Sequence, residues 1–207
     1  MDNAKIKKLL KSVQDGNMPV KDAMEKLKHL PYEDLGIARV DHHRELRHGI
    51  PEVVFAAGKS RKDIKLIADS MMKHSGKLLI TKADYDIYKD TEKVCKKYKK
   101  KVTFYERSGV IAVGGARKLE GLVAILCAGT SDLPIAEEAV ATATFLGSRV
   151  ESVSDVGVAG LHRLMNAKSI IAEAGVLIVT AGKEGGDPLL IGGIEGKQLN
   201  VVASHLW

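Results

Sequence analysis

The chain has 207 residues, 45% of them hydrophobic and 28% charged, which suits one large folded domain or two small ones. No apolar run approaches the ~20 residues that span a bilayer, and two cysteines exclude a disulfide framework, so we expect a cytoplasmic protein without membrane contact. The net charge of +6 is typical of a protein that binds nucleic acid or of an enzyme that acts on anionic nucleotides. An aromatic content of only 4% makes nucleic-acid binding the less favoured of the two.

Residues 1–58 are predicted to form a helical hairpin followed by a linker. Apolar residues recur at helical spacing in two short segments. The first segment ends at Gly16, because the residue after a helix often needs a left-handed backbone, and the second ends at Pro31. The residues of the predicted apolar seam are Ile6, Leu9, Leu10, Val13, Val20, Ala23, Met24 and Leu27. We interpret this hairpin as a packing element or a subunit contact.

The segment 34–58 is dense in titratable groups but follows neither a helical nor a strand period. Its possible metal ligands include Asp41, His42, His43, Glu45, His48 and Glu52. Adjacent His42 and His43 would point in different directions, and His43 and His48 lack the i, i+4 spacing of a helical ligand pair. The pattern therefore favours a solvated or interface linker, and we predict no metal site. Another interpretation is that its arginines reach the active site of a neighbouring subunit.

Residues 59–115 are predicted to form a small α/β subdomain. Strands are expected at 51–57, 77–81 and 101–106, with one helix capped by Ser60 and another spanning 83–100. Cys95 lies on the apolar side of the second helix, where a cysteine packs as a small hydrophobic residue. The lysines at its end favour a solvated helix terminus over a nucleic-acid patch. The glycine-rich segment 108–121 is interpreted as the boundary to the next domain.

Residues 116–207 follow the pattern of a doubly wound parallel sheet. Strands are predicted at 122–127, 149–153, 176–181 and 200–203. The helix after the first strand carries Pro134 in its first turn and ends at Gly147, and the next helix runs from 161 to about 174. Strands that are apolar on both faces belong in a parallel sheet that helices cover on both sides. The predicted class is therefore α/β.

Three loops of this domain carry the predicted site, because the carboxyl ends of parallel strands meet at one edge. Glycines allow the backbone to approach a phosphate, and carboxylates or a histidine can bind ribose hydroxyls or move protons. The candidate substrate-binding residues are Gly129, Thr130, Ser131, Asp132, Gly157, Gly160 and Gly182. The candidate catalytic residues are Asp155, His162 and Glu184.

Four stretches of the chain resemble the LarB family of nickel-pincer nucleotide cofactor biosynthesis, which belongs to the PurE-like superfamily of AIR carboxylases. They are LPYEDLGIARVDHHRELRHGIPEVVFAAGKS, AGTSDLPIAEEA, SDVGVAGLHRL and VTAGKEG, and the resemblance covers nearly the whole chain. The resemblance implies an enzyme that carboxylates nicotinic acid adenine dinucleotide with CO₂ or bicarbonate and hydrolyses its phosphoanhydride. The implied products are AMP and pyridinium-3,5-dicarboxylate mononucleotide. Mg²⁺ and a homo-oligomer with shared sites are also implied.

The sequence departs from the family pattern in its cysteines. The family's nucleophile lies in a Ser-Cys segment beyond the fourth strand of the sheet, and neither Cys95 nor Cys127 stands at that position. We therefore expect an incomplete, C-terminally truncated PurE-like domain without the carboxylation step. A non-catalytic mononucleotide-binding relative, a lysine-based nucleic-acid module and an AIR carboxylase or mutase of purine (IMP) biosynthesis are the alternatives.

Overall fold

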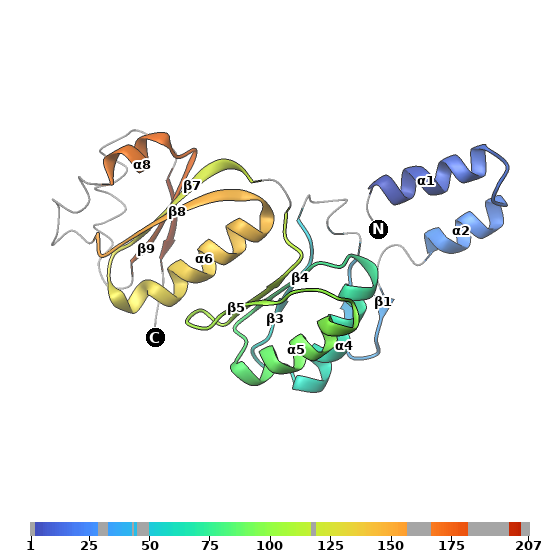
Figure 1. Cartoon of the computed structure of the whole chain (residues 1–207), viewed down its shortest axis with the longest axis horizontal. Helices are drawn as coiled ribbons and strands as arrows, with labels where there is room; N and C mark the ends of the chain where they lie inside the picture. Colours follow the sequence, from blue (N-terminus) through green and yellow to red (C-terminus); the bar gives the residue numbers. More distant parts are fainter. Residues whose placement is uncertain are drawn as a thin grey trace. The chain divides into compact units, whose positions relative to one another are not determined.

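The computed structural model describes residues 3–28, 33–42, 44, 50–116, 119–156, 167–181 and 199–203. The chain divides into two compact units, 1–103 with 111–114 and 104–110 with 115–207. Both combine helices with sheets, so the predicted α/β class is confirmed (Figure 1). The finer division at residues 58 and 115 stays a prediction. Among the described helices, none has the length and hydropathy of a membrane span.

The chain begins with a helical hairpin, α1 (Asn3–Gln14) and α2 (Val20–Lys28). Gly16 has φ +73° and ends α1, and the amide of Asn17 donates a hydrogen bond to the carbonyl of Ser12 at 2.9 Å. This is the left-handed helix ending that the sequence predicted.

The predicted seam of the hairpin is confirmed only in part. Leu9 and Ala23 are buried, whereas three of its members are more than half exposed: Leu10, Val20 and Met24. Each short helix has one partner here, so only the residues between the two helices are covered. Pro31 and the side chain of Leu27 lie outside the described residues.

A two-stranded antiparallel hairpin follows, formed by β1 (Glu33–Asp34) and β2 (Arg39–Val40). The turn between them contains Gly36 at φ +78°, whose amide donates to Asp34 Oδ1 at 2.8 Å. The start of the segment predicted as a solvated or interface linker thus forms a regular hairpin, and its Val40 is buried, with 2% of its surface exposed. The Asp-x-Gly spacing is a turn signature that sequence reasoning passed over.

A four-stranded sheet, with β3, β4 and most of β6 in the first unit, has the order β3-β4-β6-β5. Its strands are β3 (Val53–Phe55), β4 (Leu78–Thr81), β5 (Thr103–Tyr105) and β6 (Val110–Val113). β3 is parallel to β4, and β4 is antiparallel to β6, so the sheet is mixed. Residues 110–113 lie inside the segment predicted as a boundary and form a strand that is mostly buried.

Two helices of this unit pack against each other: α4 (Arg61–His74) and α5 (Tyr85–Lys97). Ser60 caps α4 as predicted, accepting the amide of Asp63 at 3.2 Å. The predicted inner face of α4 is confirmed, since Ile64, Ile67, Ala68 and Met71 are all buried. The first turn of α4 also carries Arg61, whose guanidinium donates to Asp90 of α5 at 2.8 Å.

The second unit contains a four-stranded sheet with the order β10-β9-β7-β8, in which every neighbouring pair is parallel. Its strands are β7 (Glu120–Cys127), β8 (Ser148–Ser154), β9 (Val176–Ala181) and β10 (Leu199–Ala203). All four predicted strands are confirmed. The helix α6 (Leu133–Leu146) begins with Pro134 and ends at Gly147, whose φ is +107°.

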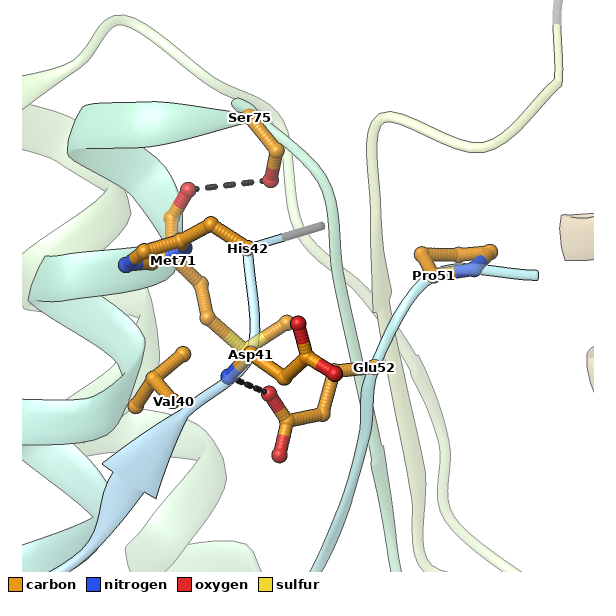
Figure 2. A pocket seen from close by; sticks show the side chains of 7 residues that line it. All are labelled: Val40, Asp41, His42, Pro51, Glu52, Met71 and Ser75. Carbon is orange, nitrogen blue, oxygen red and sulfur yellow. Dashed lines mark hydrogen bonds between the residues drawn. The ribbon is translucent and has the colours of Figure 1, made fainter. Parts of the chain in front are cut away.

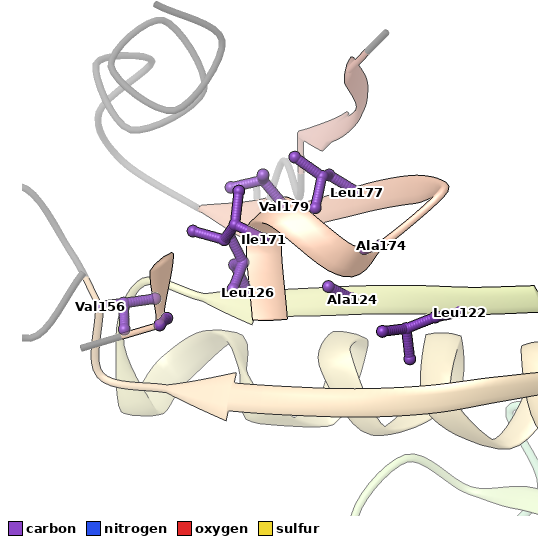
Figure 3. Close-up of a cluster of buried hydrophobic side chains, with 9 residues drawn as sticks. Leu122, Ala124, Leu126, Val156, Ile171, Ala174, Leu177 and Val179 are labelled. Atoms are coloured by element: carbon purple, nitrogen blue, oxygen red, sulfur yellow. The ribbon is translucent and has the colours of Figure 1, made fainter. Parts of the chain in front are cut away.

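Helices cover the parallel sheet on both faces at its central strand β7. Leu122, Ala124 and Leu126 pack toward α8 (Lys168–Glu173), where Ile171 is buried against them (Figure 3). The alternate residues Ile125 and Cys127 pack instead with Ala136 of α6. Side chains of a strand point alternately to the two faces, so an unbroken apolar strand requires two covering layers.

Candidate functional site

The strands of the second unit end together at one edge of the sheet. Cys127, the last residue of β7, pairs with Ser154 at the end of β8 and with Thr180 near the end of β9. Ala181 in turn pairs with Ala203 of β10. The described segments after β7 and β8 therefore leave the sheet at the same edge, as predicted from its parallel order.

Residues 128–132 connect β7 to α6, and the last three of them, Thr130–Asp132, form a short 3₁₀ turn. The amide of Asp132 donates to the carbonyl of Gly129 at 3.0 Å. Thr130 and Ser131 are exposed, whereas Asp132 is only 3% exposed. A Cβ built on Gly129 would lie 3.5 Å from Asp132 Oδ2, so the carboxylate lies directly against this glycine. Asp132 thus orders the loop from inside, and Ser131 presents its hydroxyl to solvent.

Asp155 lies immediately after β8 and has a left-handed backbone, with φ +61°. Aspartate tolerates this region better than most residues with a side chain. The turn directs the next amide, that of Val156, to the carbonyl of Cys127 at 3.1 Å, and Val156 is buried in the core. The Asp155 side chain remains exposed at the edge of the sheet.

Cys127 ends β7 and pairs with Ser154, the residue before Asp155. Its thiol is fully buried and donates to the carbonyl of Gly129 at 3.1 Å. Burial raises the pKa of this thiol, and the charges of Asp132 and Asp155 raise it further, against the opposing effect of a hydrogen bond with Thr180. Cys127 packs in the core, as predicted.

The remaining predicted site residues fall on parts of the chain outside the described ranges. They are Gly157, Gly160, His162, Gly182 and Glu184. The structure therefore brings together the loop 129–132 and Asp155, and the roles of all ten predicted residues stay predictions.

A small, solvent-open pocket in the first unit was missed by sequence reasoning. Its lining residues are Val40, Asp41, His42, Pro51, Glu52, Met71 and Ser75 (Figure 2). The Glu52 carboxylate accepts a hydrogen bond from the amide of Asp41, and burial raises the pKa of Glu52. Titratable groups that the sequence assigned to a linker thus fold against α4.

These observations define an α/β protein with a mixed sheet in its first unit and a parallel, helix-covered sheet in its second. Residues 32–114 match the family model of the LarB/PurE-like N-terminal domain. Over 194 residues the chain is 33% identical to Uncharacterized protein MJ0165 of Methanocaldococcus jannaschii. The aligned region covers 90% of this chain and 75% of that protein. The chain belongs to the LarB family.

Proposed function

We propose that this chain binds nicotinic acid adenine dinucleotide, the substrate of the LarB reaction, at the carboxyl edge of its parallel sheet. In that reaction the pyridinium ring gains a carboxylate from CO₂ or bicarbonate, and water cleaves the phosphoanhydride. AMP and pyridinium-3,5-dicarboxylate mononucleotide are the products. The observation that carries the proposal is the convergence of the exposed Ser131 loop and the exposed Asp155 side chain at one edge.

The loop 128–132 suits a phosphate or a ribose. The exposed hydroxyls of Thr130 and Ser131 are hydrogen-bonding groups, and Gly129 leaves its backbone accessible. Behind them, the dipole of α6 favours an anion at the start of the helix, although the amides of Asp132 and Leu133 already donate to Gly129 and Thr130. Pro134 strengthens this start because its fixed φ is already helical and its missing N–H is not needed there.

Carboxylate oxygens at this edge fit the ligand preference of Mg²⁺. We propose that Asp155, whose side chain is exposed, holds the ion, while buried Asp132 supports the loop. When bound, Mg²⁺ would neutralise charge on the phosphoanhydride.

The two cysteines favour a second candidate function, a non-catalytic mononucleotide-binding protein. A pyridinium ring is electron-poor, and a thiolate that adds to it makes the carbon to be carboxylated nucleophilic. Burial raises the pKa of Cys95 to about 11 and also raises that of Cys127, so neither forms a thiolate readily at neutral pH. Both sulfur atoms lie in the core and out of reach of a substrate ring.

The exposed apolar side chains of the helical hairpin support a homo-oligomer. Leu10, Val20 and Met24 are 55%, 65% and 54% exposed on two short helices. Apolar side chains grouped in this way mark contact surfaces. We propose that the hairpin mediates subunit contact, which light scattering of the wild type and of a Leu10→Lys, Met24→Lys variant would test through a fall in mass.

Calorimetric titration with nicotinic acid adenine dinucleotide, run beside assays of AMP release and labelled bicarbonate incorporation, separates the candidates. Binding with AMP and label supports the LarB reaction, and binding alone supports the non-catalytic protein. Ser131→Ala should weaken binding roughly tenfold, the effect of one lost hydrogen bond of about 1.4 kcal/mol. Ser148→Ala is the matched control, because Ser148 begins β8 at the opposite edge. No binding, or equal losses in both variants, would overturn both candidates.

A further inference from the structure

Three side chains with metal-binding atoms converge in the first unit. Glu33 lies in β1, His42 follows β2, and His74 is the last residue of α4. His42 Nε2 is 3.1 Å from Glu33 Oε2, and His74 Nδ1 is 3.6 Å from the same oxygen. One ligand atom from each of the three lies within 4.8 Å of the other two. The imidazole rings are stacked, with centroids 3.9 Å apart.

These separations match the edges of a metal coordination sphere. Nitrogen and oxygen ligands lie ~2.0–2.1 Å from Zn²⁺, so two ligands of a tetrahedral site are roughly 3.3 Å apart. The distances of 3.1 and 3.6 Å from Glu33 Oε2 lie on either side of that value. The third edge, between the two imidazole nitrogens, is at most 4.8 Å, so closure around one ion requires the two rings to draw together.

Ser70 of α4 holds the three side chains in this arrangement. Its hydroxyl donates to Glu33 Oε2 and lies 3.2 Å from His42 Nε2. Its carbonyl accepts a hydrogen bond from His74 Nδ1 at 2.9 Å, which an ion at that nitrogen would replace. Ser70 is 6% exposed, so the supporting group is fixed by packing. Each of these contacts falls on an atom that would face the ion, so Ser70 gathers the three ligands and gives up its hydrogen bonds to them when the ion binds.

Access to the cluster differs among its members. The His42 side chain is only 6% exposed, whereas those of Glu33 and His74 are 35% and 38% exposed. An ion can therefore enter beside Glu33 and His74. His42 also lines the pocket that contains the Asp41 and Glu52 side chains (Figure 2).

We propose that Glu33, His42 and His74 form a binding site for a divalent transition-metal ion of the Zn²⁺ type. Two imidazoles and one carboxylate are ligands that Zn²⁺, Fe²⁺ and Co²⁺ accept. Three protein ligands leave a coordination position for water or a substrate atom. The site joins the β1–β2 hairpin to the end of α4, and it is separate from the proposed nucleotide edge in the second unit.

Titration of the metal-free full chain with Zn²⁺, and with Co²⁺ followed by visible absorption, tests this site. One equivalent should bind, with Co²⁺ bands typical of four-coordinate nitrogen and oxygen ligands. Glu33→Gln and His74→Asn should each weaken binding at least tenfold, and both positions are exposed enough for the variants to fold.

The matched control is Glu92→Gln, which removes a carboxylate from α5 outside the cluster and should leave the affinity unchanged. Zn²⁺ should also raise the melting temperature of the wild type and of Glu92→Gln, and should not raise that of the Glu33 and His74 variants. An equivalent that binds with the same affinity in Glu33→Gln and His74→Asn would overturn the proposal, as would the absence of binding by the wild type.

Discussion

The two sheets of this protein place their polar groups by different rules. In the parallel sheet of the second unit, β7, β8 and β9 end at one edge, so residues that follow each strand are brought together by the strand order alone. In the mixed sheet of the first unit, β4 and β6 run in opposite directions and define no common edge. Its titratable cluster instead joins a hairpin to the end of a helix. A site at a parallel edge can thus be inferred from strand order, and one between other elements cannot.

Leu126→Ala tests the core of the parallel sheet and should have the largest effect on stability. Leu126 is fully buried between β7 and α8, and removing its side chain leaves a cavity there. The free energy of unfolding should fall by about 3–5 kcal/mol, measured by urea denaturation. Val176→Ala, at a position 36% exposed at the start of β9, should cost less than about 1 kcal/mol. If Leu126→Ala and Val176→Ala lost the same free energy of unfolding, β7 would not be the core strand.

Gly114→Ala should break the mixed sheet by a steric conflict. Gly114 has φ +66°, and a Cβ there would press against the carbonyl oxygen of Gly76. Backbone strain and overpacking together should cost about 3 kcal/mol, read from the same denaturation curves. Gly58→Ala is the control, since Gly58 has φ +78° with no atom near its Cβ position, and about 1 kcal/mol is expected. Similar losses for the two variants would contradict the close approach of the Gly76 carbonyl.

Two substitutions of Asp155 distinguish its backbone conformation from its charge at the edge of the parallel sheet. Asp155→Ala places a residue ill-suited to φ +61° after β8 and should lose about 1 kcal/mol of stability. Asp155→Asn keeps a side chain that tolerates this conformation and should be nearly neutral. Both variants should bind nicotinic acid adenine dinucleotide with Mg²⁺ more weakly than the wild type by calorimetry. Unchanged affinity in both would remove Asp155 from the proposed site.

The ion pair between α4 and α5 gives the first unit a pH dependence of its own. A hydrogen bond from Arg61, with the charge of Lys65 adding to it, lowers the pKa of Asp90. The folded pKa thus lies below the unfolded value of about 3.9, so this stability is present above that pH and is lost as the pH falls through the folded pKa. Asp90→Asn should melt below the wild type at pH 7, and the difference should narrow near pH 3. A constant difference would exclude the ion pair as its cause.

Much of the second unit could be predicted from the sequence because its pattern is local. The unbroken apolar run 122–127 predicts a strand buried on both faces, and Gly147 marks the end of the following helix. The same local reasoning placed Ser60 at the start of α4. Only part of the predicted site can be compared with the structure, since His162 and Glu184 lie outside the described residues.

The first unit shows where such reasoning stops. The strand 110–113 is only four residues long and has glycines at both ends, so it was interpreted as a boundary, although an apolar run after a turn also suits a hairpin strand. The Glu33 cluster depends on Ser70 and His74, which follow at a long distance in the chain. Spacing within residues 34–58 therefore held no information about it, and only tertiary packing brings these groups together.

Hydrogen–deuterium exchange of the full chain, with and without nicotinic acid adenine dinucleotide and Mg²⁺, tests the central claim most directly. The account predicts slower exchange in peptides that contain residues 128–134 and 154–156, where the loop after β7 and the turn at Asp155 meet. Protection confined to the pocket of the first unit or to the lysine-rich end of α5, with none at the edge of the parallel sheet, would contradict it.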